Sequence, residues 1–310
     1  MVTAMAPTTP GRRTIGTQLP IQALSTMFAA PWEAEAGPAD LLRAAQVCDA
    51  AGYDYIGVCD HVAIPRAAAP AMGTQWMDPI TTLSWLAGQT ERIDLLTHVF
   101  VLGYRHPLVA AKQFATLDHL SGGRLIAGIG AGHLQGEFDA LGADFTERGR
   151  DLDAALPTLI AALENEFVDD LGARPRPAQE PRPPIWIAGS SAPALRRAAR
   201  FGDGWLPQGP ASDDHVETLR RLLDDAGRSL DRFVIGHLAP PVHLGRPDWD
   251  VGRRTITGSA DEVTETLLST VPAGVSQIQL AVRARDLDEC CDQLEAVAEQ
   301  VVPRLRSTRD

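Results

Sequence analysis

Short apolar runs alternate with stretches of helical spacing along the whole chain. The expected strands cover residues 13–20, 53–60, 93–102, 125–132, 185–189, 204–208, 233–240 and 276–282. The expected helices cover residues 38–52, 78–91, 106–123, 147–165, 193–202, 213–227, 260–271 and 286–301. The apolar runs are nearly continuous, which is typical of parallel strands buried on both faces. Eight β/α units in series predict a TIM (β/α)8 barrel with insertions, and a doubly wound sheet is the alternative.

Residues that favour helix ends support several of these boundaries. Gly52 follows the first expected helix, where glycine commonly ends a helix in the left-handed conformation. Asp78 precedes the second expected helix as a capping residue, and Pro79 occupies its first turn. Residues 172–184 hold five prolines, which predict an irregular or extended segment near the mouth of the barrel.

The stretch RLIAGIGAGHLQGEF, residues 124–138, places four glycines after a short apolar run. A dinucleotide-binding fingerprint requires G-x-G-x-x-G in an early βαβ unit, but the spacing here is G-x-G-x-G-x-x-x-G at the fourth strand. We interpret these glycines as positions where the strand end passes close to a flat ligand, with barrel packing as the alternative. His133, Gln135 and Glu137 follow directly, where barrel active sites form.

Histidines also mark the ends of neighbouring strands. Asp60 and His61 end the second strand, Thr97 and His98 interrupt the third, and His133 follows the fourth. A lone histidine is more often structural, but three at consecutive strand ends indicate a catalytic site. The other histidines are three expected surface residues and two without an assigned role, namely His106, His119 and His215, and His237 and His243.

Patterns for metal and serine chemistry are missing from the sequence. The first strand offers no H-x-H pair, and the sequence holds no H-E-x-x-H motif, cysteine set or G-x-S-x-G elbow. We therefore expect no metal. Gly189, Ser190 and Ser191 lie between a strand and a helix N-terminus, where N–H groups, hydroxyls and the helix dipole suit a phosphate. Ordinary capping by serine is the alternative.

Composition narrows the range of partners. The 310-residue chain has a net charge of −12, which disfavours nucleic acid and anionic membranes. No apolar run approaches the roughly 20 residues that span a bilayer. The four cysteines form no C-x-x-C pair, so we expect reduced thiols in a cytoplasmic protein. We also expect a small-molecule substrate and a homodimer. We expect residues 1–12 to form a disordered tail and residues 13–310 to form a single domain.

Several segments together resemble the bacterial luciferase-like family of flavin- and deazaflavin-dependent oxidoreductases. In order, they are CDH at 59–61, RHPLVAAKQFATLDHLSGGRLIAGIGAG at 105–132, EF and G at 137–142, ER at 147–148, PPIWIAGSSAPALRRAARFGDGWLP at 183–207 and GSADEVTETL at 258–267. The long segment at 105–132 is the most specific of them. The resemblance implies a TIM barrel that binds FMN or the deazaflavin coenzyme F420 over the carboxyl ends of its strands.

The resemblance also implies roles for individual residues. His61 would face the reacting edge of the cofactor ring as the acid or base, with His133 as the second candidate, because a histidine pKa lies near neutral pH. A non-prolyl cis peptide is expected near Thr97 and His98. The cofactor-binding residues implied are Asp60, Thr97, His98, Val99, Gly132, Gly189, Ser190 and Ser191. Sugar-phosphate dehydrogenases of the family carry glutamate at the position of His133, so we expect a different substrate.

These observations predict an F420-dependent oxidoreductase that transfers a hydride between the deazaflavin C5 and a small organic substrate. An FMN-dependent monooxygenase is the nearest alternative. A flavin-binding barrel without catalytic activity is a second alternative, and replacing His61 would leave its cofactor affinity and its role intact. A spectrum of the protein mixed with each cofactor discriminates between the first two.

Overall fold

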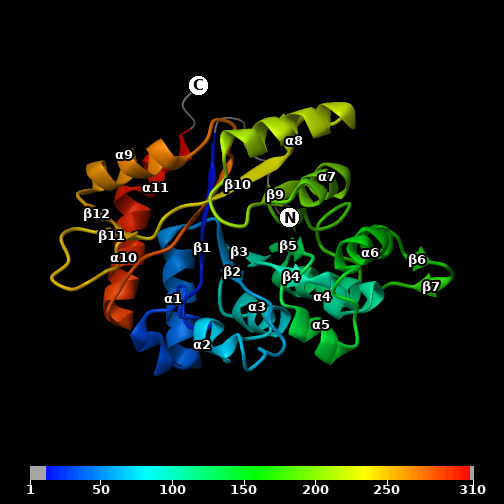
Figure 1. Cartoon of the computed structure of the whole chain (residues 1–310), viewed down its shortest axis with the longest axis horizontal. Helices are drawn as coiled ribbons and strands as arrows, with labels where there is room; N and C mark the ends of the chain where they lie inside the picture. The colour runs from blue at the N-terminus through cyan, green and yellow to red at the C-terminus, as the bar shows by residue number, and fades with distance from the viewer. Residues whose placement is uncertain (1–11, 308–310) are drawn as a thin grey trace.

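Eight parallel strands form a closed barrel in the computed structural model, which describes residues 12–307 (Figure 1). In barrel order the strands are β1 (Thr14–Gln18), β2 (Tyr55–Val58), β3 (Asp94–Thr97), β5 (Leu125–Gly130), β8 (Ile185–Ala188), β9 (Gly204–Leu206), β10 (Val234–Leu238) and β13 (Gln277–Leu280). Each strand pairs in parallel with the next, and β13 pairs with β1 to close the barrel. The predicted TIM barrel is confirmed, and the doubly wound alternative is wrong.

A break divides the third strand of the barrel. β3 ends at Thr97, and β4 (Phe100–Val101) resumes the pairing with β5 after a cis peptide bond between His98 and Val99. The hydrophobic pattern predicts one strand over 93–102 because the residues on both sides of the break are equally apolar. The cis bond lies where the family resemblance implies one.

Helices surround the barrel, and the longer ones follow its strands as predicted (Figure 1). They are α1 (Pro38–Ala51), α3 (Pro79–Ala87), α4 (Pro107–Ser121), α6 (Arg148–Glu164), α7 (Ala192–Phe201), α8 (Asp213–Asp225), α9 (Ala260–Thr270) and α10 (Leu287–Gln300). Shorter elements are α2 (Ala69–Met72), α5 (Gln135–Leu141), α11 (Val302–Arg306), the 3-10 turns η1 (Pro31–Ala34), η2 (Leu102–Tyr104) and η3 (Leu230–Arg232), and the strands β6 (Phe167–Val168), β7 (Leu171–Gly172), β11 (Val242–Leu244) and β12 (Ile256–Gly258).

Two of the predicted helix ends have the expected chemistry. The Asp78 carboxylate accepts a hydrogen bond from the backbone N–H of Thr81 at 2.8 Å and so caps α3. Gly52 follows α1 with a φ of 84°, the left-handed conformation in which glycine ends a helix without a steric penalty.

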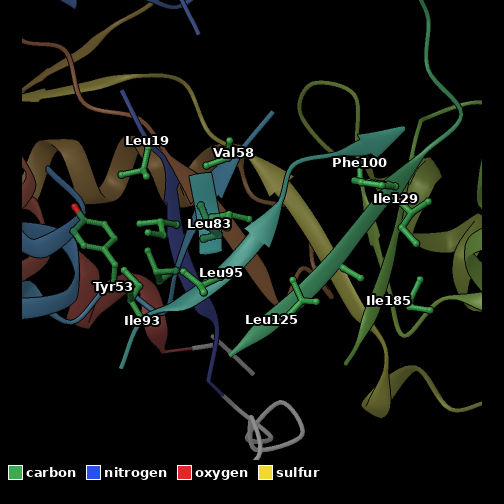
Figure 2. Packing of buried hydrophobic residues seen from close by; sticks show 14 of the residues in the cluster. Leu19, Tyr53, Val58, Leu83, Ile93, Leu95, Phe100, Leu125, Ile129 and Ile185 are labelled. Carbon is green, nitrogen blue, oxygen red and sulfur yellow. The ribbon is translucent and has the colours of Figure 1, made fainter. Parts of the chain in front are cut away.

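Apolar side chains fill two layers, one outside the strands and one inside the barrel. Leu95, Leu125 and Ile185 point outward to the helices, where Leu83 of α3 joins them (Figure 2). The interior holds a smaller cluster formed by Tyr55, Leu96, Ile126, Trp186, Leu206 and Val234. Neighbouring residues of one strand therefore enter different apolar layers, which explains the nearly continuous apolar runs.

The proline-rich segment 172–184 lies at the opposite end of the barrel from the one predicted. The Gln179 side chain donates to the carbonyl of Leu125, the first residue of β5, at 2.8 Å. Arg182 pairs with Asp203, which directly precedes β9. These contacts lie at the amino ends of strands, whereas barrel active sites form at the carboxyl ends. The segment is irregular as predicted, but its expected place near the mouth is wrong because it leads into the start of β8.

Of the predicted N-terminal tail, residues 1–11 lie outside the described residues. Arg12 forms a bridge with Ser307, and its side chain pairs with Asp54 at 2.8 Å, so Arg12 belongs to the folded part. No helix within residues 12–307 is long and apolar enough to span a membrane. The four cysteines have free thiols.

Candidate active site

The carboxyl ends of the strands surround a cavity of about 650 Å³. The residues that the sequence predicted for the site and that line this cavity are Asp60, His61, His98, Val99, Gly132, His133, Gly189, Ser190 and Ser191. Thr97 does not line it, because its side chain is fully buried and its hydroxyl donates to the carbonyl of Gly128 at 2.9 Å. Segments from four regions of the chain therefore meet at one mouth of the barrel.

The glycines of β5 and the following loop make room for protein atoms. A Cβ on Gly128 would lie 2.0 Å from a carbonyl oxygen of β3, and one on Gly136 would lie 2.4 Å from Pro65. A Cβ on Gly130 would lie 2.7 Å from Val99, although Gly130 also lines the cavity. The interpretation that the glycines clear space for a ligand is therefore wrong for Gly128 and Gly136, where barrel packing requires them.

His61 and Glu137 form a hydrogen-bonded pair at the cavity. Nδ1 of His61 lies 2.6 Å from Oε2 of Glu137, whose side chain is fully buried. Burial alone would raise the pKa of Glu137, but the hydrogen bonds from His61 and from the N–H groups of Ala63 and Val62 lower it below its ordinary value. Because an ionised carboxylate only accepts hydrogen bonds, Nδ1 of His61 carries the proton of this bond. Nε2 is then the ring atom that is free to exchange a proton.

Four donors in total hold the Glu137 carboxylate in place. Oε1 accepts the N–H groups of Val62 at 2.6 Å and Ala63 at 3.1 Å. Oε2 accepts the Tyr104 hydroxyl at 2.9 Å in addition to His61. Burial and the nearby carboxylate raise the pKa of Tyr104, so the hydroxyl keeps its proton and remains a donor. This carboxylate is therefore fixed from both sides, and its position fixes the His61 ring.

Aromatic rings flank His61 within the cavity wall. The Trp76 ring centroid lies 4.3 Å from that of His61, and the His133 ring stands nearly perpendicular to it at 5.4 Å. Burial, together with the neighbouring His61, lowers the pKa of His133, so His133 is neutral at neutral pH. The two predicted catalytic histidines are therefore neighbours in the structure.

The Asp60 carboxylate is occupied by protein groups. It accepts two hydrogen bonds from the Arg105 guanidinium, at 2.6 and 2.9 Å, and one from the Val101 N–H at 2.8 Å. Burial raises the pKa of Asp60, and the pair with Arg105 offsets part of that effect. The Val101 bond ties the segment after β2 to β4, and the bidentate pair ties it to Arg105, which follows η2.

Three further histidines are buried or half-buried. Burial lowers the pKa of His98 to about 4, so this cavity-lining ring is neutral at neutral pH. His237, whose role the sequence left open, also has its pKa lowered to about 4 by burial, and its Nδ1 accepts the N–H of Ala211. His243 packs against Trp249, with its Nδ1 2.9 Å from the carbonyl of Arg283. Neither His237 nor His243 lines the cavity.

One end of the cavity has the features of an anion site. Ser191 occupies the N-cap position of α7 but makes no side-chain capping bond, so the ordinary capping alternative is wrong for this residue. The Ser190 hydroxyl oxygen accepts the N–H of Gln208 at 2.9 Å. Arg148 and Arg197 line the same cavity, but the Asp153 carboxylate pairs with Arg197 through two hydrogen bonds, at 2.6 and 3.1 Å. Arg148 and the positive end of the α7 dipole therefore favour a negative charge there.

Four of these residues were not identified from the sequence, namely Tyr104, Arg105, Arg148 and Arg197. Arg105 and Arg148 belong to the RHPL and ER segments that carry the family resemblance, so that resemblance was the available clue. Glu137 was noted only as a polar residue after the fourth strand. Among residues 12–307, no group of three or more His, Cys, Asp or Glu side chains is arranged to hold a metal ion.

A parallel barrel whose mouth gathers titratable and anion-binding groups places this chain among the TIM-barrel enzymes. Comparison with known families makes the assignment narrower. The chain belongs to the luciferase-like monooxygenase family, whose model matches residues 20–250. Members of this family are oxidoreductases, and the chain is assigned to that class of enzyme.

Relatives of known activity use two different cofactors. An F420-dependent glucose-6-phosphate dehydrogenase from Beutenbergia cavernae is 33% identical over 216 residues, which cover 64% of this chain and 61% of that protein. An FMNH2-dependent dimethylsulfone monooxygenase from Pseudomonas putida is 27% identical over 195 residues, which cover 59% of this chain and 51% of that protein. An uncharacterised protein from Sinorhizobium fredii is 34% identical over 201 residues, which cover 62% of this chain and 55% of that protein.

The barrel is also similar to solved structures. An F420-dependent secondary alcohol dehydrogenase, solved in complex with an F420–acetone adduct, superposes with a TM-score of 0.76 at 16% identity. The superposition covers 96% of this chain and all of that one, 100%. At this identity the likeness shows the shared fold.

Proposed function

We propose that this protein is an F420-dependent oxidoreductase that transfers a hydride between C5 of the deazaflavin and a small organic substrate. The observation that carries the proposal is the pair of His61 and Glu137 at the cavity, with Nδ1 of the histidine held 2.6 Å from the carboxylate. A histidine with one nitrogen fixed and the other free suits the transfer of the single proton that accompanies a hydride. The F420-dependent relative at 33% identity supports the choice of cofactor.

The residues at the mouth fit such a cofactor. A volume of about 650 Å³ lies within the usual range of small-molecule sites. The N-terminus of α7, the hydroxyls of Ser190 and Ser191, and the guanidinium group of Arg148 would hold a phosphate. His98, Val99 and Gly132 would contact the ring, and Asp60 and Thr97 would act by holding the strand ends that carry these residues.

The residues around His61 determine how a proton moves. The bound deazaflavin would supply the carbon that carries the hydride. His61 would donate or accept the substrate proton through Nε2, because its Nδ1–H is given to Glu137. The buried carboxylate keeps the ring in one orientation and stabilises its charge when Nε2 is protonated. Trp76 packs edge-on against the His61 ring, and His133 is the second candidate for the proton transfer.

An FMN-dependent monooxygenase is the second candidate function. It is favoured by the FMNH2-dependent relative at 27% identity, and the same anion site would serve the FMN phosphate. A barrel that binds a flavin without turnover is the alternative outside enzyme chemistry. We also propose that the protein is a cytoplasmic homodimer, and its four free thiols support the compartment.

A binding titration with each cofactor tests the proposal. Purified protein is titrated with F420 and, separately, with FMN, and binding is followed by the fluorescence of the cofactor. We expect F420 to bind at least tenfold more tightly than FMN. The opposite order would replace the proposal by the monooxygenase, and no binding of either cofactor would overturn both. Turnover is then sought with enones, imines and small alcohols, and binding of F420 without turnover on any of them would favour the non-catalytic barrel.

A further inference from the structure

A second cavity of about 220 Å³ lies beside the one already described, and we call it the side cavity. Its walls come from the carboxyl ends of β1 and β13, from η1 and from α10. Gln18, Phe28 and Leu238 line both cavities. The side cavity therefore shares part of its wall with the candidate active site.

Most of the side cavity is apolar, and its two charged residues are engaged by backbone. Its wall includes Leu19, Trp32, Leu280, Val282 and Leu294. Glu33 accepts the N–H groups of Ile21 at 2.7 Å and Ala30 at 2.6 Å, and Arg283 donates to the carbonyl of Phe28 at 2.6 Å. Burial raises the pKa of Glu33, and its hydrogen bonds and the Arg283 charge offset part of that effect. This environment favours an uncharged ligand.

One polar side chain of the side cavity has no partner. Gln279 is 5% exposed, its Oε1 is buried, and none of the hydrogen bonds within residues 12–307 uses its side-chain amide. The neighbouring glutamines are satisfied, because Gln277 donates to the Tyr55 hydroxyl and Gln18 donates to the Cys59 sulfur. A ligand group that both donates and accepts hydrogen bonds would satisfy this unpaired buried amide. A hydroxyl is the simplest such group.

Aromatic contacts lead from the side cavity to His61. Phe28 packs edge-on against Trp76 with ring centroids 5.8 Å apart, and Trp76 contacts His61 at 4.3 Å. Phe28 and Trp76 therefore form an apolar wall that runs from the side cavity to His61.

We propose that the side cavity binds the apolar end of an uncharged substrate whose hydroxyl group pairs with the amide of Gln279. In such a substrate, the hydroxyl group lies at a distance from the carbon that reacts beside His61. The orientation of the reacting carbon toward His61 rests on the proposed function, but binding in the side cavity does not require a cofactor. Substrates with a charged or phosphorylated end are excluded from this cavity.

Calorimetric titration of the whole protein without cofactor tests the proposal. The probes are 1-indanol, indane, which lacks the hydroxyl, and indane-1-carboxylate, which replaces it by a charge. We expect saturable binding of 1-indanol, at least tenfold weaker binding of indane-1-carboxylate, and a loss of at least tenfold in 1-indanol affinity for Gln279→Leu. The affinity for indane should change by less than about threefold in that variant, because no hydrogen bond is lost.

Gln113→Leu is the matched control. Oε1 of Gln113 is also buried without a partner, but this residue lies on α4 and lines neither cavity. The affinity of the Gln113→Leu variant for 1-indanol should equal that of the wild type. If Gln279→Leu does not fold, as judged by circular dichroism, Gln279→Met takes its place because its side chain has a similar length.

The outcomes separate this proposal from the proposed function. No saturable binding of 1-indanol, an equal loss in the Gln113 variant, or tighter binding of the carboxylate would each overturn the side-cavity proposal. If 1-indanol binds as expected but neither F420 nor FMN does, the proposed function fails and the side cavity stands. If F420 binds and 1-indanol does not, the side-cavity proposal fails alone.

Discussion

Nδ1 of His61 lies 2.6 Å from Oε2 of Glu137, although 76 positions of sequence separate the two residues. The carboxylate is buried and fully hydrogen-bonded, whereas the histidine ring faces the cavity. This relationship assigns different tasks to the two side chains. Under the proposed function, His61 would exchange a proton with the substrate, and Glu137 would position the His61 ring without touching the substrate.

The first prediction concerns His61. His61→Ala should reduce turnover by roughly 10² or more, because it removes the group that transfers a proton in the transition state. Cofactor affinity should change by only a few-fold. Steady-state kinetics and a cofactor titration measure the two effects, and His119→Ala, an exposed position of α4, is the control. Full turnover in His61→Ala would transfer the role to His133 or to a bound water.

The second prediction concerns Glu137 as a positioning residue. Glu137→Gln should reduce turnover by roughly tenfold or more, because the amide no longer fixes Nδ1 of His61 as the protonated nitrogen. The pKa of Glu137 is lowered from 4.5 in the folded protein, so its carboxylate stabilises the fold above that pH and the contribution is lost as the pH falls through the folded pKa. The gap in unfolding temperature between wild type and variant should therefore narrow below pH 4.5. An unchanged gap would argue against an ionised Glu137, and Glu295→Gln on the exposed face of α10 is the control.

The third prediction tests the anion site. Ser190→Asp keeps an acceptor for the Gln208 N–H but places a negative charge against the proposed phosphate. Cofactor affinity should fall by more than tenfold, which corresponds to about 1.4 kcal/mol. Ser269→Asp adds the same charge at an exposed position of α9 and should leave the affinity unchanged. Equal affinities of wild type and Ser190→Asp for both F420 and FMN would contradict a phosphate site beside Ser190.

The fourth prediction tests the packing role of the β5 glycines. In Gly128→Ala the new Cβ would lie 2.0 Å from the Thr97 carbonyl oxygen, which is backbone and cannot rotate away. The free energy of unfolding should fall by at least about 2 kcal/mol. Gly88→Ala meets its nearest atom at 3.7 Å and should unfold like the wild type. Chemical denaturation measures both, and a Gly128→Ala protein as stable as the wild type would contradict the packing role of this glycine.

The fifth prediction concerns Asp94, at the start of β3. Burial and the Asp54 and Asp118 carboxylates raise its pKa from 3.8 to about 8. Because the folded pKa lies above the unfolded one, folding binds a proton and stability decreases as the pH rises from 3.8 to about 8. Asp94→Asn should therefore raise the unfolding temperature, and by more at pH 8 than at pH 4. Asp139→Asn, at an exposed position of α5, should show no such trend.

Much of the fold could be predicted from the sequence, because alternating apolar runs and helix ends are local properties. The apolar pattern did not predict the break after Thr97, because apolar residues lie on both sides of it, and only the family resemblance implied a cis peptide there. The proline content of 172–184 indicated its conformation but carried no information about which end of the barrel it occupies.

The part of the candidate site that follows the strand ends could also be predicted from the sequence. Barrel geometry brings the residues that follow parallel strands to one mouth, so His61 and His133 could be placed together. The pairing of Glu137 with His61 and the empty hydrogen-bonding capacity of Gln279 depend on contacts between distant segments. Local sequence does not encode such contacts.

Closure of the barrel by β1 and β13 has a consequence for the order of folding. The Thr17 hydroxyl donates to the Leu280 carbonyl at 3.0 Å across 263 positions of sequence. Parallel pairing over such a separation is entropically costly and forms slowly, so β1 keeps an unpaired edge while the intervening units assemble. The side cavity lies at this seam and exists only after it has closed. During refolding, protection against hydrogen exchange of the Thr14 amide, which donates to the Ser276 carbonyl beside β13, should therefore appear in the same late step as 1-indanol binding.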